Sequence, residues 1–168
     1  LVFYHPDDPA ALRAEQDALL LEVWQACNKS GHELLLEVIL PENGPDKDER
    51  HYHTMLEHFY QLGIKPDWWK LPPLSSASWQ QITALIERED PWSRGILILG
   101  LDAPSDKLRA GFAEAAAHPM IKGFAVGRTI FGQPSRRWMQ GELSDEALIE
   151  EVKRNYLTLI GYWREARR

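Results

Sequence analysis

The sequence predicts an α/β protein built on a parallel sheet. Five short apolar runs alternate with stretches of helical spacing, and the second to fifth runs begin roughly 30 residues apart, as in βα repeats. The runs are nearly continuous in apolar residues, which is typical of parallel strands covered on both faces. The chain has 168 residues, 44% of them hydrophobic and 26% charged, so we expect a single domain over residues 1–168.

The strands and the first helix follow from these runs and from turn residues. Strands are predicted over residues 1–5, 33–41, 67–72, 95–101 and 121–127. The first helix should begin at Asp8 and Pro9, with Asp8 as the N-cap and Pro9 as the first helical residue. It should end at Gly31, since glycine adopts the left-handed conformation common after a helix.

The later helices are bounded by glycine and serine residues. The second helix should end near Gly63, after an apolar face that runs from Met55 to Tyr60. A serine cap is predicted for the third helix at Ser76 or Ser78, and for the fourth at Ser105. After the fifth strand we expect an irregular segment, and then a long last helix capped by Ser144.

Two architectures are compatible with five βα units. They could form an open, doubly wound sheet, or they could be the last five units of an eight-fold TIM barrel, which usually needs ~250 residues. Length favours the open sheet. The abrupt start, with a strand already under way at Leu1, favours the barrel and predicts three further units upstream of it. The Gly-rich nucleotide-binding signatures of open sheets are absent from the sequence.

Composition excludes several classes of partner. The net charge of −6 argues against nucleic acid or an anionic membrane as the main partner. The apolar runs are too short to span a bilayer, and the N-terminus has no signal-peptide pattern. A single cysteine, Cys27, fits a reducing compartment, so we expect a cytoplasmic protein.

Glu37 and Lys70 are the candidate catalytic residues, because each interrupts an otherwise apolar strand. Neighbouring parallel strands lie about 4.8 Å apart, so the two side chains could touch if they lie at similar heights. A structural ion pair is one interpretation. The other is a lysine nucleophile: a poorly solvated lysine can attack a carbonyl as the free amine and form a Schiff base, while the carboxylate moves protons.

Further candidates lie at the carboxyl ends of the other strands, where parallel α/β proteins place their sites. Gly100 and Asp102 follow the fourth strand, and Gly127 and Arg128 follow the fifth. Glycines let backbone N–H groups approach an anion, and the arginine guanidinium adds two parallel donors, so these strand ends suit a phosphate. That Arg128 is an ordinary surface arginine at a turn is an equal alternative. His5 ends the first strand and joins them as a candidate substrate-binding residue.

The remaining histidines do not predict a metal site. The stretch "HYHTMLEH" contains His51, His53 and His58, but these lack the i, i+4 spacing of zinc-binding helices. We interpret them as solvated helix residues. His5 is then the only histidine expected at the carboxyl end of a strand, so neither a metal nor another cofactor is predicted.

Four ordered motifs carry a family resemblance. The stretches "FYHPDDP", "GHELLLEVILP", "GIKPDWWKLPP" and "GFAVGRTIFGQP" together resemble the aldolase-like domain fused to 5-dehydro-2-deoxygluconokinase in bacterial myo-inositol catabolism. The resemblance covers essentially the whole chain, and extends more distantly to tagatose-bisphosphate aldolase, a lysine-dependent barrel. It implies that the five strands are numbers four to eight of a TIM barrel.

The resemblance also implies roles for the candidate residues. Lys70 would match the Schiff-base lysine, Glu37 the catalytic carboxylate, Gly127 and Arg128 the phosphate turn, and Gly100 the glycine region after strand seven. A second lysine that the family barrels carry on strand four has no counterpart in "LVFYH".

The implied activity is a class I aldolase (a lyase) that needs no cofactor. It would cleave 5-dehydro-2-deoxy-D-gluconate 6-phosphate to dihydroxyacetone phosphate and malonate semialdehyde. We further expect a homo-oligomer and a fused or partner sugar kinase. The alternatives are an aldolase of the tagatose-bisphosphate type and a non-catalytic sugar-phosphate-binding module that regulates the kinase.

Overall fold

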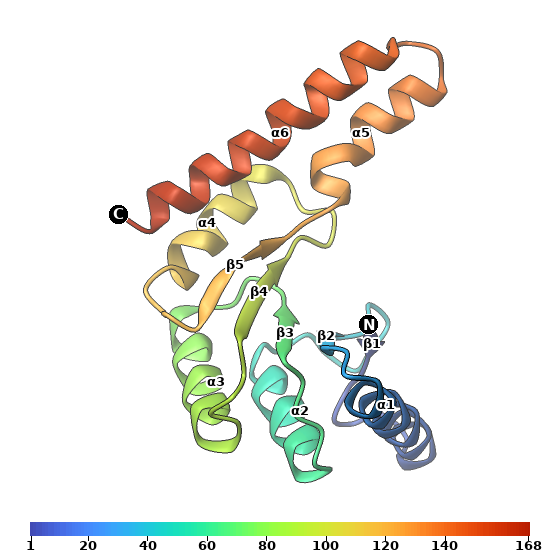
Figure 1. The fold of residues 1–168 in the computed structure, drawn as a ribbon, viewed down its shortest axis with the longest axis vertical. Helices are drawn as coiled ribbons and strands as arrows, with labels where there is room; N and C mark the ends of the chain where they lie inside the picture. The colour runs from blue at the N-terminus through green and yellow to red at the C-terminus, as the bar shows by residue number, and fades with distance from the viewer.

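The computed structural model describes residues 1–168 and contains one five-stranded sheet, in which all neighbouring strands are parallel (Figure 1). The strands are β1 (Val2–Phe3), β2 (Leu35–Ile39), β3 (Trp68–Leu71), β4 (Gly95–Leu99) and β5 (Ile121–Ala125). Each lies within the range predicted for it, so the α/β class and the βα repeat are confirmed.

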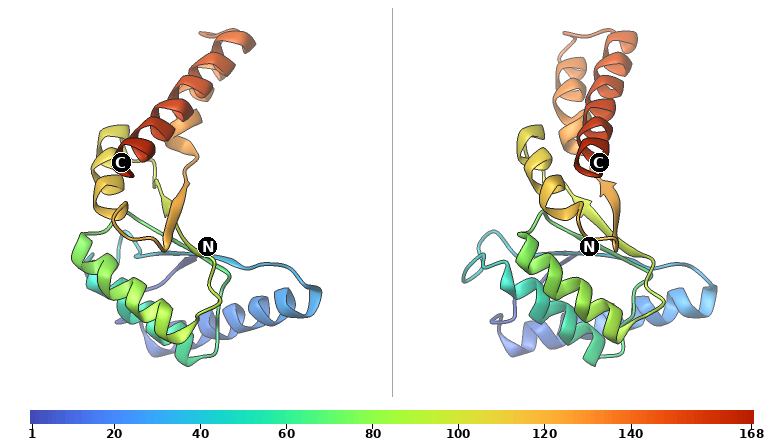
Figure 2. Two further views of the ribbon diagram at one scale, coloured as in Figure 1. Left: turned by 60° about the vertical axis from the view of Figure 1, so that its left-hand side comes forward. Right: turned by 90° about the vertical axis from the view of Figure 1, so that its left-hand side faces the viewer.

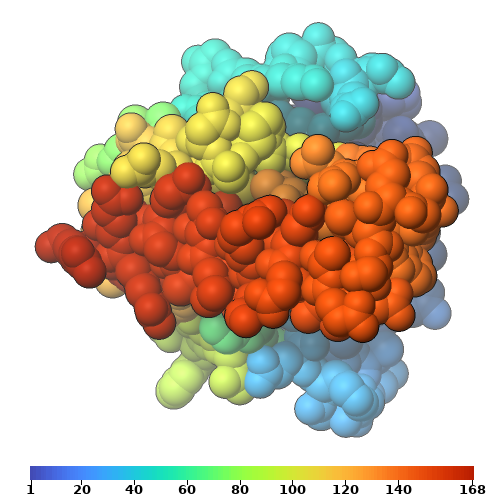
Figure 3. Space-filling model, turned by 90° about the horizontal axis from the view of Figure 1, so that it is seen from above, coloured from blue at the N-terminus to red at the C-terminus, as the bar shows by residue number.

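Six helices accompany the sheet. They are α1 (Ala10–Ser30), α2 (Arg50–Gln61), α3 (Ser76–Glu89), α4 (Ser105–Ala115), α5 (Arg128–Met139) and α6 (Asp145–Ala166). Helices α1 to α4 each connect one strand to the next, whereas α5 and α6 follow the last strand as a helical hairpin (Figures 1 and 2). Seen from above, this hairpin lies across the top of the molecule beside α4 (Figure 3). None of the helices is long and apolar enough to cross a membrane.

The strand order follows the chain order, β1-β2-β3-β4-β5. A doubly wound sheet reverses its strand order part-way, which places helices on both faces. Here no reversal occurs, and right-handed crossovers in a constant direction place the connecting helices on one face. The doubly wound alternative is therefore wrong.

The burial of the strand side chains shows that the helices cover one face of the sheet. One row of strand side chains is buried against the helices. It includes Leu36, Val38, Trp69, Leu71, Ile96 and Ile98, none more than 2% exposed. Most of the other row is exposed or half-buried, and Ile39 and Leu99 at the carboxyl ends of their strands are its buried members. The exposed or half-buried members include Phe3, Leu35, Glu37, Trp68, Lys70 and Leu97. The expectation that the strands are covered on both faces is therefore wrong, because no helix of this chain crosses to the second face.

Three of the predicted helix ends are confirmed. Gly31 follows α1 in the left-handed conformation, with φ 73°, and its N–H donates to the carbonyl oxygen of Cys27. Ser144 caps α6, because its hydroxyl accepts the N–H of Ala147 at 3.2 Å. Gly63, with φ 80°, reverses the chain just after α2, as expected.

Three other predicted caps are wrong, each by a small displacement. Pro9 and Pro104 occupy the N-cap positions of α1 and α4, so neither Asp8 nor Ser105 caps its helix. The Asp8 carboxylate instead accepts the N–H of His5 at 3.0 Å. Helix α3 is capped by Ser75, one residue before the predicted Ser76.

Helix α5 replaces the irregular segment that we expected after the last strand. Helix α5 contains Pro134, which is unfavourable inside a helix because proline lacks the N–H that would bond to the carbonyl four residues earlier. That carbonyl belongs to Ile130, and Asn155 of α6 donates its side-chain N–H to it at 2.8 Å. The neighbouring helix thus supplies the hydrogen bond that the proline cannot make.

We expect Asn155→Ala to lower the free energy of unfolding by about 1–2 kcal/mol, because it leaves the Ile130 carbonyl without a donor. In a Pro134→Ala background the new backbone N–H reaches the same carbonyl, so the cost of Asn155→Ala should fall by at least half. Urea denaturation of the wild type, the two single variants and the double variant measures this coupling. A variant of the neighbouring exposed residue, Arg154→Ala, is the control. If Asn155→Ala lowers the free energy of unfolding equally with and without Pro134, Asn155 does not replace the hydrogen bond that the proline lacks.

Candidate active site

Glu37 and Lys70 lie directly opposite each other in the register of β2 and β3. Lys70 Nζ donates to Glu37 Oε2 at 3.0 Å, and the side chains are 19% and 21% exposed. The predicted pairing is confirmed. Both side chains belong to the uncovered row of the sheet, so the pair faces the open side rather than the helix layer.

The surroundings of the pair are largely apolar. Leu97 lies opposite Lys70 on the next strand, and Glu37 is the only carboxylate within 4.0 Å of the Lys70 amine. Trp68 lies two residues earlier on the same row. Its indole N–H donates to Glu33 at 3.0 Å and not to Glu37. The lysine therefore has one polar partner, and a proton leaving its amine has one direct acceptor.

A pocket of about 280 Å³ gathers six of the seven predicted site residues at the carboxyl ends of the strands. These are Glu37, Lys70, Gly100, Asp102, Gly127 and Arg128. The seventh, His5, does not line it, since its side chain is completely buried. The residues that were singled out on four separate strands thus converge at one place.

A second, larger pocket of about 890 Å³ adjoins the first and shares Leu101, Asp102 and Arg128 with it. Its other wall is the segment between β2 and α2, including Lys47 and Glu49. The volume of the larger pocket is that of a small-molecule site. Sequence patterns gave no indication of Lys47 or Glu49, because loop residues have no periodicity that reveals which way they face.

Arg128 is the first residue of α5, directly after the N-cap Gly127. The free N–H groups and the dipole of a helix N-terminus favour an anion. Arg128 forms no ion pair within the chain, so its guanidinium is available to a ligand. Both features suit a phosphate at the edge of the pocket that holds Lys70.

The turn after β4 reaches the pocket through an unusual backbone. Leu101 and Asp102 have φ values of 47° and 62°, in the left-handed region that costs energy for residues other than glycine. A Cβ on Gly100 would lie 2.8 Å from a methyl group of Val126, so only glycine fits where this turn meets the end of β5. The glycine predicted to approach a phosphate thus has a packing role of its own.

Glu49 links the starts of two helices at the rim of the larger pocket. Its carboxylate accepts hydrogen bonds from the N–H and the hydroxyl of Ser75, the N-cap of α3, and from the hydroxyl of Ser78 at 2.9 Å. Burial alone would raise the pKa of Glu49, but these hydrogen bonds outweigh it and hold the pKa below its usual value. Glu49 itself precedes α2, so one carboxylate positions the beginnings of α2 and α3 together.

One family model matches residues 1–167, and its description is "Uncharacterized protein conserved in bacteria (DUF2090)". The chain belongs to the DUF2090 family. A comparison with curated proteins finds no match. The site of this DUF2090 chain combines an amine paired with one carboxylate and, beside it, an unpaired arginine at a helix N-terminus.

We expect Glu49→Gln to lower the free energy of unfolding by about 1–2 kcal/mol at neutral pH, because the amide places an NH₂ group against hydrogen-bond donors. The folded-state pKa is depressed, so the stabilisation is complete above the unfolded value of 4.5 and is lost as pH falls through the folded value. Denaturation at neutral pH and near pH 3 should therefore show the two proteins converging in acid. Glu42→Gln, an exposed carboxylate of the same loop, serves as control, and a pH-independent difference would contradict the assignment.

Proposed function

We propose that this DUF2090 chain is a class I aldolase that acts on a phosphorylated keto-sugar acid. The observation that supports this most directly is the Lys70–Glu37 hydrogen bond in the same pocket as Arg128. A Schiff-base enzyme needs an amine nucleophile, a proton carrier beside it and a group that fixes the substrate at a distance. Lys70, Glu37 and the α5 N-terminus with Arg128 meet these three needs.

The proposed reaction begins with transfer of the Lys70 ammonium proton to Glu37. The neutral amine attacks the ketone carbon, and Glu37 gives its proton to the oxygen to form a carbinolamine. Glu37 then takes a proton from the nitrogen and passes it to the hydroxyl group, which leaves as water. In the resulting iminium ion the carbon–carbon bond breaks as the hydroxyl group on the departing fragment gives its proton to Glu37 and becomes the aldehyde. The bonding electrons form an enamine, which is protonated at carbon, and water then hydrolyses the iminium ion to release the ketone product and Lys70.

The site supports a class of substrate, and the family resemblance suggests which member of that class it is. The helix N-terminus and Arg128 favour a phosphorylated ketone over an uncharged one. The sugar acid 5-dehydro-2-deoxy-D-gluconate 6-phosphate, with dihydroxyacetone phosphate and malonate semialdehyde as products, is proposed from the family motifs described above.

We also propose that the five βα units are part of an eight-fold barrel. The sequential strand order and the constant direction of the crossovers support this, because both are features of TIM barrels. The apolar side chains on the open row of the sheet, such as Phe3 and Leu35, support it as well, since further units would cover them. Covering them would also exclude water from the Lys70 pair.

A non-catalytic sugar-phosphate-binding module is the second candidate. It is favoured by the smaller pocket, in which Lys70 is the only lysine, whereas the related barrels carry two. In this case Arg128 and the α5 N-terminus would bind the phosphate, and the ion pair would be structural.

Borohydride reduction distinguishes the two. With dihydroxyacetone phosphate present, sodium borohydride should attach a reduced triose phosphate to Lys70 of the complete natural protein, as located by peptide mass spectrometry. Lys70→Met should abolish the adduct. Lys122→Met, at the opposite end of the sheet, should not. Absence of any adduct on the wild-type protein, or an adduct that persists in Lys70→Met, would rule out the Schiff-base proposal.

The phosphate role of Arg128 has its own test. Arg128→Gln should raise the dihydroxyacetone phosphate concentration needed for half-maximal trapping by about tenfold or more, because it removes a charge-assisted hydrogen bond. Trapping of unphosphorylated dihydroxyacetone should change little. Arg136→Gln, on the same helix but outside the pocket of Lys70, is the matched control. Equal effects on both ketones would contradict a phosphate contact.

A further inference from the structure

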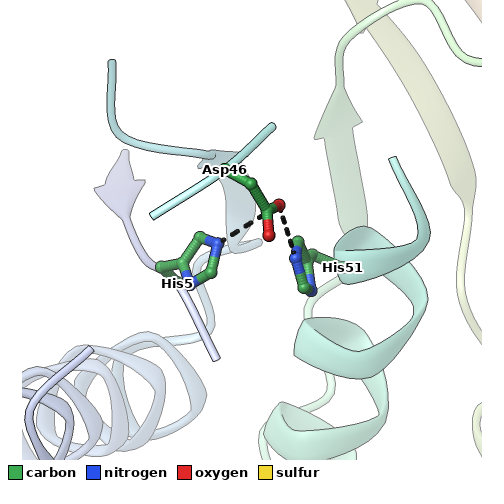
Figure 4. A group of neighbouring side chains, drawn as sticks. All are labelled: His5, Asp46 and His51. Atoms are coloured by element: carbon green, nitrogen blue, oxygen red, sulfur yellow. Dashed lines mark hydrogen bonds and ion pairs between the residues drawn. The ribbon is translucent and has the colours of Figure 1, made fainter. Parts of the chain in front are cut away.

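A second cluster of polar side chains lies apart from the Lys70 pocket. It contains His5 just after β1, Asp46 in the segment between β2 and α2, and His51 near the start of α2 (Figure 4). His51 Nε2 lies 2.7 Å and His5 Nε2 lies 3.8 Å from the same oxygen, Asp46 Oδ1. One potential ligand atom from each residue lies within 4.8 Å of the other two.

His5 is the unusual member of this cluster, which we call the His5 cluster. Its side chain is fully buried, yet its Nε2 atom has no hydrogen-bond partner. Its other ring nitrogen, Nδ1, accepts the backbone N–H of Asp7 at 3.1 Å, so the neutral ring carries its proton on Nε2. This buried N–H points towards Asp46 at a distance too long for a hydrogen bond, which is an unfavourable arrangement.

The exposure of the other two residues makes the cluster reachable from solvent. The side chain of Asp46 is 54% exposed and that of His51 is 20% exposed. The His5 ring packs edge-on against the His51 ring, with centroids 4.5 Å apart. The cluster therefore has a buried nitrogen at its base and a carboxylate at its mouth.

We propose that His5, Asp46 and His51 bind a divalent transition-metal ion such as Zn²⁺. Two imidazoles and one carboxylate form a ligand set suited to zinc, and three protein ligands leave a fourth position for water or another small ligand. The ion gives the unpartnered His5 nitrogen a partner. It also joins three segments: the end of β1, the loop after β2 and the start of α2.

Binding requires a defined change in protonation. When Nε2 of His5 coordinates the ion, the ring proton must move to Nδ1, and the contact with the Asp7 N–H is given up. The Asp7 carboxylate, whose Oδ2 atom lies 4.0 Å from Nδ1, can accept this proton in a hydrogen bond once the two groups move closer. Carboxylates commonly orient metal-binding histidines in this way.

This site is independent of the proposed aldolase activity. It contains neither Lys70 nor Glu37, and a Schiff-base mechanism does not use a metal. The two proposals can therefore fail separately, since one is measured by trapping on Lys70 and the other by metal binding. The sequence did not indicate the site because His51 and His5 are far apart in the chain, and only the packing of α2 beside β1 brings their rings together.

Calorimetric titration of the metal-free protein with Zn²⁺ tests the proposal. We expect one ion per chain, with a dissociation constant in the micromolar range or below. His51→Ala and Asp46→Ala should each weaken binding by more than about tenfold, because even groups that only orient ligands contribute that much. His53→Ala, on the same helix but outside the cluster, is the control and should bind as the wild type does. No saturable binding, or equal affinity of the His51 and His53 variants, would overturn the proposal.

His5 needs a different measurement, because replacing a fully buried ring can prevent folding. Nitrogen NMR of the histidine rings in the wild-type protein reports which nitrogen carries the proton. Zn²⁺ should convert His5 from the Nε2–H form to the Nδ1–H form. A His5 ring that stays unchanged at saturating Zn²⁺ would exclude it as a ligand and so refute the proposed site.

Discussion

The alternation of side chains along β2, β3 and β4 is the constraint on which both the core and the candidate site depend. One row, which includes Val38, Trp69 and Ile98, is removed from water by the helices. The other row carries Glu37 and Lys70 to the uncovered face, where the parallel register sets them opposite each other. A slip of one residue in β3 would bury the lysine amine among apolar helix side chains and expose Trp69, so the packing that stabilises the sheet also fixes the ion pair.

The features that could be predicted from the sequence are those with a local signal. A charge within an apolar strand marked Glu37 and Lys70, and the βα repeat placed them on strands that are consecutive in the chain. Gly31 and Ser144 were recognisable because the preference of each residue type for a helix end depends on its own backbone and hydrogen bonds. The strand order was left open, because apolar runs show that a strand is buried but not which strand lies beside it.

The features that could not be predicted depend on contacts between distant segments. Helix α5 contains a proline that argues against it, and the compensating hydrogen bond comes from Asn155 on another helix. Ser75 is favoured as a cap by its contact with Glu49, which lies 26 residues earlier. The His5 cluster joins residues from three segments. The one-sided cover of the sheet belongs here as well, because it follows from the direction of the crossovers and not from the composition of the strands.

The agreement between strand order and chain order also has a consequence for how the protein folds. Paired residues such as Glu37 and Lys70 are 33 residues apart, and each new strand adds only to the one made just before it. Loop closure therefore costs a similar, modest entropy at each of these pairings, because each one joins strands that are consecutive in the chain. Such a chain can assemble progressively from one unit to the next, and during synthesis on the ribosome each strand has its partner already in place when it emerges.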